Sequence, residues 1–332
     1  MSTPARPLLL PLVPLYYAAL ALREARLRLG LEQVRHLRRP VISIGSLSAG
    51  GAGKTPLTIA LAQALMSRGL SVDVLSRGYA RRNRLAARVD VNGTADEFGD
   101  EPLLIAREAG VPVYVAAQRY EAGLLAEANH PAAVHLLDDG FQHRQLHRDV
   151  NILLLDRNDW FVDRLLPAGN LREPLAAARR ATIVAIPAND EAPEFEAALR
   201  AWGWEGPVWR LHRRIEVPKI EGSVAAFCGI ARPQQFFAGL ESAGLQVGAR
   251  LSFADHYRYT AHDMERILSA ARTAGARALV TTEKDRARMG VLMASFEELL
   301  PLCTVRLRVE IEGEDAAVSF LISRLNAVQE HA

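Results

Sequence analysis

Cysteine is scarce in this chain of 332 residues, and neither sign of charge predominates. The two cysteines, Cys228 and Cys303, lie in apolar, strand-like stretches and lack the spacing of metal ligands. This pattern excludes a disulfide framework and indicates buried free thiols in a reducing cytoplasm. The net charge of +2 is too small to indicate a nucleic-acid-binding protein, so we expect no nucleic-acid partner.

The composition is otherwise that of an ordinary globular protein, with 49% hydrophobic and 23% charged residues. No internal repeat or low-complexity segment is visible. A chain of this length exceeds one ordinary hydrophobic core, which favours two α/β domains.

The N-terminal stretch is unusual because residues 7–22, PLLLPLVPLYYAALAL, carry no charge. The next residues, REARLRLGLEQVRHLRR, hold six arginines against two glutamates. An apolar run interrupted by Pro11 and Pro14 is short for a membrane-spanning helix. We predict that residues 1–39 form an amphipathic helical region on the cytoplasmic membrane surface. The alternatives are a cleaved secretory signal and a helix packed on the protein's own core.

A glycine-rich stretch, SIGSLSAGGAGKTPLTIALAQAL (residues 43–65), follows an apolar strand and leads into an apolar helical pattern. Backbone N–H groups of such a loop, with the positive end of the next helix, converge on a phosphate. Lys54 would reach the terminal phosphates of ATP and Thr55 would bind Mg²⁺. The alternative is a plain turn. The predicted phosphate-binding residues before Lys54 are Ser48, where the motif has its first glycine, Ala49, Gly50, Gly51, Ala52 and Gly53.

Strand-like and helix-like stretches alternate beyond this loop, which favours an α/β fold with a P-loop-type, doubly wound, mostly parallel sheet. The predicted strands are residues 71–76, 111–116, 133–139, 150–156 and 182–187. We predict a P-loop domain at residues 40–210, a smaller α/β domain at 221–302, a two-stranded connector formed by 211–220 and 303–312, and a C-terminal helix at 313–332 packed back on the P-loop domain.

Acidic residues occur where such a fold would place a metal site and a base. Asp138 and Asp139 end an apolar strand, which is how P-loop proteins bring a carboxylate to magnesium. Residues 96–101, DEFGDE, precede a helix. They are either an acidic helix start that suits the helix dipole, or they include a base that accepts a proton from a hydroxyl.

Histidines and arginines add two further sets of candidates. The stretch SFADHYRYTAHD contains His256 and His262, which are either capping residues or a histidine that orients a catalytic base. The arginines of SRGYARRNR, with others along the chain, are either solvated or suited to a multiply anionic substrate. These arginines are Arg77, Arg81, Arg82, Arg84, Arg119, Arg144 and Arg172.

Seven motifs together resemble those of the tetraacyldisaccharide 4′-kinases, which phosphorylate the lipid A disaccharide precursor at the inner membrane of Gram-negative bacteria. In family order the motifs are GSLSAGGAGKTP, LSRGYARR, FGDEPLLIA, LLDDGFQHR, LLPAGNLREPL, FADHYRYT and VTTEKDRARM. Ser46 stands where asparagine is expected and Ala52 where threonine is frequent. Both departures leave the lysine and threonine of the P-loop intact.

The resemblance implies ATP-dependent transfer of a phosphoryl group to the 4′-hydroxyl of a tetraacyldisaccharide 1-phosphate. It implies Asp100 as the general base supported by His256, with Lys54 and Arg172 also catalytic and Glu173 clamping the nucleotide. The implied magnesium ligands are Thr55, Asp138, Asp139 and Glu101. Residues 281–285, TTEKD, would line the far side of the nucleotide site. The implied substrate-binding residues are Arg77, Tyr79, Arg81, Arg119, Gln142 and His143.

The expected partners are therefore the lipid A disaccharide precursor and the cytoplasmic face of the inner membrane, reached through the N-terminal helix. No obligatory protein partner is evident. A soluble P-loop small-molecule kinase or ligase is one alternative. A nucleotide-hydrolysing switch or metallochaperone is another, although the chain has neither an N-K-x-D guanine motif nor a cysteine metal pair.

Overall fold

The computed structural model describes residues 6–129, 132–290 and 299–329. Parts of four predicted segments lie outside the described residues, including residues 130–131 of the P-loop domain. The other parts are the first five residues of the N-terminal region, residues 291–298 of the smaller domain and residues 330–332 of the C-terminal helix.

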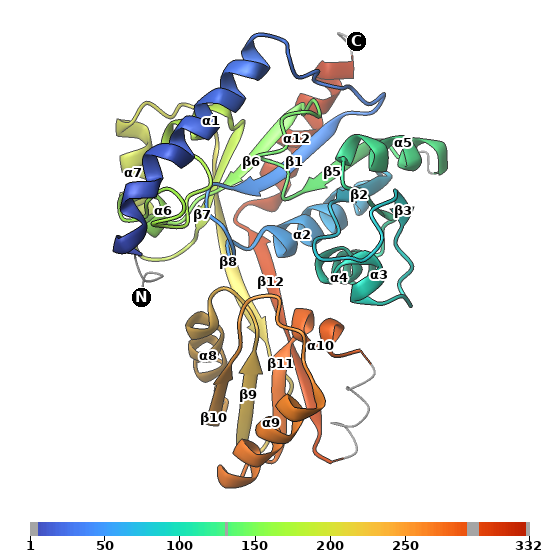
Figure 1. Ribbon diagram of the computed structural model, residues 1–332. Helices are drawn as coiled ribbons and strands as arrows, with labels where there is room; N and C mark the ends of the chain where they lie inside the picture. The colour runs from blue at the N-terminus through green and yellow to red at the C-terminus, as the bar shows by residue number, and fades with distance from the viewer. Residues whose placement is uncertain (1–5, 130–131, 291–298, 330–332) are drawn as a thin grey trace.

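Within the described residues, the P-loop half of the fold contains strands β1 to β7 and the helices that cover them (Figure 1). The strands are β1 (Val41–Ser46), β2 (Val72–Ser76), β3 (Ala87–Arg88), β4 (Val113–Val115), β5 (Val134–Asp138), β6 (Val150–Leu154) and β7 (Ile183–Pro187). The helices are α2 (Lys54–Met66), α3 (Ala95–Phe98), α4 (Asp100–Ala109), α5 (Arg119–Asn129), α6 (Arg157–Phe161), η2 (Leu175–Arg180) and α7 (Ala192–Ala201).

The other half follows in the chain and lies below the first in Figure 1. Its strands are β8 (Val208–Glu216), β9 (Ser223–Cys228), β10 (Gln246–Ser252), β11 (Ala278–Thr282) and β12 (Leu302–Ile311). Its helices are α8 (Pro233–Ser242), α9 (Ala261–Thr273) and α10 (Glu283–Met289), and α12 (Glu314–Gln329) ends the described chain.

All these strands form one 12-stranded sheet in the order β10-β9-β11-β12-β8-β7-β6-β1-β5-β2-β4-β3. Neighbours pair in parallel except at β12–β8 and β3–β4, so the predicted doubly wound, mostly parallel fold class is confirmed. Parallel strands require crossovers, and the crossover helices bury both faces of the sheet. The polar residues that follow β1 and β5 therefore lie at one edge.

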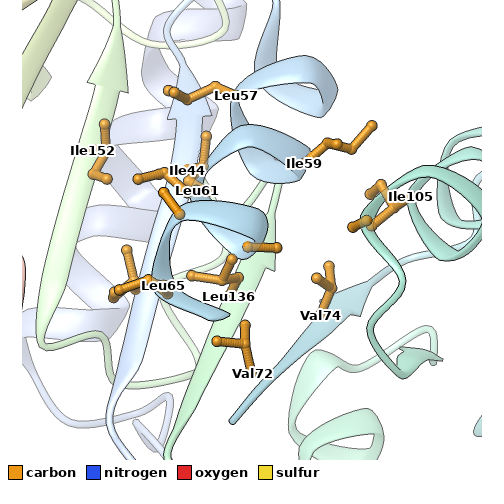
Figure 2. Packing of buried hydrophobic residues seen from close by; sticks show 14 of the residues in the cluster. Ile44, Leu57, Ile59, Leu61, Leu65, Val72, Val74, Ile105, Leu136 and Ile152 are labelled. Carbon is orange, nitrogen blue, oxygen red and sulfur yellow. The ribbon is translucent and has the colours of Figure 1, made fainter. Parts of the chain in front are cut away.

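Helix α2 is fixed in place by apolar contacts on more than one side. In Figure 2, Leu57, Leu61 and Leu65 lie over the central strands, at the four-residue spacing that keeps side chains on one helix face. Ile59 points instead toward Ile105 of α4. Because α2 is anchored on both sides, its first residue, Lys54, has a defined position.

Gly45 in β1 leaves no room for a side chain. A Cβ atom there would lie 2.5 Å from Cβ of Phe141 and 2.8 Å from its backbone nitrogen. Gly45→Ala is expected to lower the free energy of unfolding by about 1–3 kcal/mol through overpacking, measured by urea denaturation. Ser43→Ala on the same strand is the control, because its hydroxyl has no hydrogen-bond partner within the described residues. Equal stability of Gly45→Ala and wild type would contradict this packing.

The predicted connector strands pair, but they belong to the continuous sheet. Residues 306–311 of β12 pair antiparallel with residues 211–216 of β8. The start of β8 also pairs with β7, and the start of β12 pairs with β11. Residues 217–220, expected to be part of the connector, lie outside β8. Figure 1 shows the two strands running from one half of the molecule to the other.

The C-terminal helix returns to the P-loop half. Val318, Leu321 and Leu325 of α12 are buried in the same core cluster as the apolar residues of α2. The chain therefore passes from the first half to the second through β8 and comes back through β12 and α12 (Figure 1).

The N-terminal region forms η1 (Pro7–Leu12) and α1 (Val13–Arg28), and none of the residues in these two helices is buried. Pro11 lies within a 3₁₀ helix and Pro14 near the start of α1, where proline is tolerated, so neither breaks the helical path. The combined segment is long and apolar enough to span a membrane by length and composition, contrary to our expectation. The expected amphipathic character is also wrong, because apolar and basic residues separate along the helix axis and not around it.

Candidate active site

The P-loop adopts the backbone conformation that its glycines predict. Gly50, Gly51 and Gly53 have φ values of 75°, 61° and 88°, in the left-handed region that side-chain-bearing residues rarely adopt. Ser48, in place of the motif's first glycine, donates its hydroxyl to Oδ2 of Asp159 at 3.1 Å. The substitution therefore adds a contact that holds the start of the loop.

Lys54 and Arg172 converge on Asp139. Nζ of Lys54 lies 3.5 Å from Oδ1 of Asp139 and donates to Oγ of Ser46 at 3.3 Å. Arg172 donates to both carboxylate oxygens of Asp139, at 2.8 and 2.9 Å. Burial would raise the pKa of Asp139, but Lys54 and Arg172 outweigh it and hold that pKa well below its usual range. The pair of cations is therefore held at the phosphate end of the P-loop by one carboxylate.

Asp138 ends β5 as a buried carboxylate and accepts a hydrogen bond from Thr58 at 3.2 Å. Burial and the negative charges of Glu101 and Asp139 raise the pKa of Asp138 to about 7. Within residues 6–129, 132–290 and 299–329, no group of three or more His, Cys, Asp or Glu residues is placed to hold a metal ion by itself.

The oxygen donors of this site nevertheless suit magnesium. Magnesium binds through one or two carboxylates together with waters and phosphate oxygens, and does not need an all-protein cage. Asp138 and the hydroxyl of buried Thr55 are hard oxygen donors of this kind. A divalent cation would also relieve the crowding of negative charge that raises the pKa of Asp138.

Asp100 is the first residue of α4 and is nearly buried, with its side chain 5% exposed. Gly99 before it has φ 92° and packs against the backbone of Gly78, so the turn that places Asp100 requires glycine. Oδ1 of Asp100 accepts the N–H of Glu101 at 3.0 Å, and Oδ2 lies 3.2 Å from Nδ1 of His256. The predicted base and its supporting histidine are thus in contact.

The groups around Asp100 and His256 favour the charged form of each side chain. Burial alone would raise the pKa of Asp100, but the hydrogen bond from His256 and the charge of Arg288 hold it well below its usual range. Donating this hydrogen bond to Asp100 in turn raises the pKa of His256. Lys284 of α10 donates to Glu101, the neighbour of Asp100. The charges of both Glu101 and Lys54 act on Asp138, so the start of α4 lies beside the P-loop.

Four of the predicted substrate-binding residues lie around these groups. The side-chain amide of Gln142 donates to the carbonyl of Ser46 at 3.0 Å. The ring of Tyr79 lies 5.0 Å from that of His256. Burial and the charge of nearby Arg119 lower the pKa of His143 to about 3, so its imidazole is neutral at pH 7.

Comparison with known protein families identifies the family of this chain. The family model described as LpxK, tetraacyldisaccharide-1-P 4′-kinase, matches residues 5–326. The chain belongs to the tetraacyldisaccharide-1-P 4′-kinase family. A tetraacyldisaccharide 4′-kinase of Koribacter versatilis is 43% identical over 324 residues, covering 94% of this chain and 97% of the relative. One from Nitrobacter winogradskyi is 38% identical and covers 97% of this chain and 94% of the relative.

A solved structure agrees with the family membership. The crystal structure of LpxK from Aquifex aeolicus in complex with ATP is 33% identical, with a TM-score of 0.75. It covers 96% of this chain, and this chain covers 99% of it. The family and the kinase activity predicted from the sequence are thereby confirmed, and the alternatives of a nucleotide-hydrolysing switch and a soluble small-molecule enzyme are set aside.

Two predicted site residues of this LpxK-family chain make their contacts elsewhere. Arg81 donates to the carbonyl of Leu85 at 2.7 Å within its own loop. The carboxylate of Glu173 pairs with Arg180. Their predicted roles, like the other residue roles, stay predictions. His262, the second histidine considered, is exposed and lies near Glu265 on its own helix.

The structure also brings residues to the site that sequence reasoning missed. Arg288 of α10 contacts Asp100, although we gave the arginine no role within the VTTEKDRARM motif. Two residues of α1 reach the site: the hydroxyl of Tyr16 donates to the carbonyl of Arg172 at 2.8 Å, and Arg23 donates to that of Gln142. The one signal for Arg288 in the sequence is that it lies within the VTTEKDRARM motif, and nothing in the sequence indicated the contacts of α1.

Proposed function

We propose that this kinase transfers the γ-phosphoryl group of ATP to the 4′-hydroxyl of a tetraacyldisaccharide 1-phosphate, the lipid A precursor, with Asp100 as the proton acceptor. The observation that supports it is the contact of Asp100 with His256 beside the P-loop. A carboxylate with a histidine partner suits proton abstraction from a hydroxyl. The Lys54, Asp139 and Arg172 cluster next to it suits the phosphates of ATP.

The phosphate end of the site aligns the phosphates of ATP and neutralises their charge. Backbone N–H groups of residues 50–55 and Nζ of Lys54 hold the phosphates of ATP, while Arg172 faces the phosphoryl group in transfer. Thr55 and Asp138 are the residues that would hold magnesium, with Asp139 and Glu101 close by. Bound magnesium neutralises charge on the phosphates.

The acceptor end supplies the proton acceptor and the grip on the sugar. Oδ2 of Asp100 receives the proton of the 4′-hydroxyl late in the reaction, because phosphoryl transfer proceeds through a loose transition state. His256 orients that oxygen. The ring of Tyr79 presents a flat apolar face to the sugar. Arg77 and Arg119 bind the phosphate that the acceptor already carries, and neutral His143 contributes a hydrogen bond.

The two halves of the sheet would act as two domains joined by β8 and β12. Asp100 comes from the P-loop half and His256 from the other, so the acceptor site is complete only when the halves are in contact. The proposed domains keep the predicted boundaries, residues 40–210 and 221–302. The connector strands are counted as part of the sheet.

The acceptor itself provides a specific test of this reaction. Wild-type protein is incubated in detergent micelles with γ-labelled ATP and either the tetraacyldisaccharide 1-phosphate or its 4′-deoxy analogue. Label is expected in the lipid only when the 4′-hydroxyl is present. Equal labelling of both acceptors would show that another hydroxyl or the phosphate is the acceptor, against the proposal.

The exposed N-terminal helices suit attachment to the cytoplasmic face of the inner membrane. No residue of η1 or α1 is buried, so the leucines of these two helices are accessible to the acyl boundary of the bilayer. The basic residues at the end of α1 would then lie at anionic headgroups. Because α1 also touches Arg172 and Gln142, attachment would bring the site to the lipid substrate.

Two leucines of α1 test this attachment. Leu15 and Leu22 are 69% and 64% exposed. Replacing both with serine is expected to weaken binding to phosphatidylglycerol-containing vesicles by about tenfold or more, because two apolar side chains no longer enter the bilayer. Thermal unfolding should not change. Leu85→Ser, at another exposed leucine, is the matched control. Unchanged vesicle binding by the double variant would refute the anchor.

A further inference from the structure

Arg288 is a nearly buried arginine whose guanidinium is directed at Asp100. Its side chain is 6% exposed. Nε donates to Oδ2 of Asp100 at 2.7 Å, and Nη2 pairs with the same carboxylate. Nη2 also lies 3.3 Å from Nδ1 of His256. The arginine therefore contacts both members of the proposed base pair.

The far side of the guanidinium is held just as firmly. Nη1 of Arg288 donates to the carbonyl of Gly229 at 2.6 Å and to Oδ1 of Asp285 at 3.1 Å. Asp285 is fully buried and accepts hydrogen bonds from the N–H of Gly229 and from the hydroxyls of Tyr259 and Thr282. This network fixes the position from which Arg288 reaches across to Asp100.

Within the part of the chain that the structure describes, the contacts to Oδ2 of Asp100 come from Arg288 and His256. Oδ1 is satisfied by the N–H of Glu101 within α4, whereas Oδ2 is shared by Arg288 and His256. Both partners come from the half of the molecule that does not contain α4. We propose that Arg288 is a positioning residue for phosphoryl transfer, which holds the carboxylate of Asp100 in the orientation that presents Oδ2 to His256 and the acceptor hydroxyl.

This inference rests on the proposed role of Asp100 as proton acceptor. The planar fork of arginine is what the position requires, because one side chain must meet Asp100 on one edge and Gly229 with Asp285 on another. A lysine is a single point of charge and cannot make both sets of contacts at once. Charge alone is therefore not expected to replace Arg288.

A double-mutant cycle between Arg288 and Asp100 tests whether the arginine acts through the carboxylate. Arg288→Gln is expected to lower kcat about 10- to 100-fold, with the KM for ATP changed less than about threefold. Arg288→Lys should lose nearly as much. In an Asp100→Asn background the same substitutions are expected to change the residual kcat less than about threefold, because the group being positioned is already absent.

Arg286→Gln is the matched control, since Arg286 lies on the same short helix and donates to Thr304, not to Asp100. Thermal melting checks that each variant folds, and Arg288→Lys carries the cycle if Arg288→Gln does not fold. A loss that is as large in the Asp100→Asn background as in wild type would assign Arg288 a merely structural role and overturn the inference alone. Unchanged or higher kcat in Arg288→Gln would also overturn it. If Asp100→Asn keeps wild-type activity, the proposed base and the inference both fail.

Discussion

Replacing Lys54 with alanine is expected to lower kcat/KM for transfer from ATP by about 10³-fold or more, close to complete loss. Lys54 begins α2 and places its ammonium 3.5 Å from Oδ1 of Asp139 and 3.3 Å from Oγ of Ser46, at the phosphate end of the site. Without Lys54, only Arg172 offsets the negative charge of Asp139 in this cluster. The negative charge that develops on the phosphoryl group in transfer is then less well stabilised. The measurement is initial-rate kinetics with γ-labelled ATP and the lipid acceptor.

Lys219→Ala provides a matched control for that loss. Lys219 is an exposed lysine after β8, outside the P-loop. Its replacement is expected to leave kcat/KM within about twofold of wild type, as for surface changes in general. Transfer by Lys54→Ala at the level of Lys219→Ala would show that the glycine-rich loop is not the phosphate site.

Asp100→Asn is expected to lower kcat about 10³-fold while ATP affinity stays within about threefold of wild type. Asparagine keeps the shape of the side chain but cannot accept the proton of the 4′-hydroxyl. The P-loop contacts do not involve Asp100, whose own partners are Glu101, His256 and Arg288. Rapid-quench kinetics gives kcat, and equilibrium binding of ATP gives the affinity.

The outcome that would contradict the base assignment is a comparable loss of ATP binding. Such a loss would mean that Asp100 holds the two halves of the nucleotide site together and does not act on the acceptor. His256→Ala is a useful companion, because the histidine contacts Oδ2 of Asp100 but lies on the other half of the molecule. A smaller fall in kcat than for Asp100→Asn is expected, since His256 acts through the carboxylate.

The central strands of the P-loop half were predictable because each carries its own apolar signal, whereas β3 and β10 were not among the predicted strands. The stretch 133–139 is apolar up to its two aspartates, and β5 runs from Val134 to Asp138. The P-loop was predictable for a similar reason, since its glycines meet conformational requirements that no distant residue sets. Local sequence therefore placed Lys54 and Asp138 at the same edge of the sheet.

The parts that were not predictable depend on contacts between distant segments. The sequence indicated that the stretches 211–220 and 303–312 pair with each other, but not that each also pairs with a further strand. Arg288 and Asp100 are 188 residues apart, and an arginine aimed at a carboxylate looks in sequence like any arginine on a short helix. The contacts of α1 with Arg172 and Gln142 also join segments that are far apart in the sequence, so no local pattern predicts them.

Transfer of labelled γ-phosphate to the tetraacyldisaccharide 1-phosphate in detergent micelles, compared between wild type and Lys54→Ala, is the most direct test of whether this site is the lipid kinase centre. The expected result is labelled lipid with phosphate on the 4′ position for wild type and almost none for Lys54→Ala. Lysine-dependent hydrolysis of ATP with no labelled lipid would contradict the proposed acceptor, even though it would leave the P-loop as a nucleotide site.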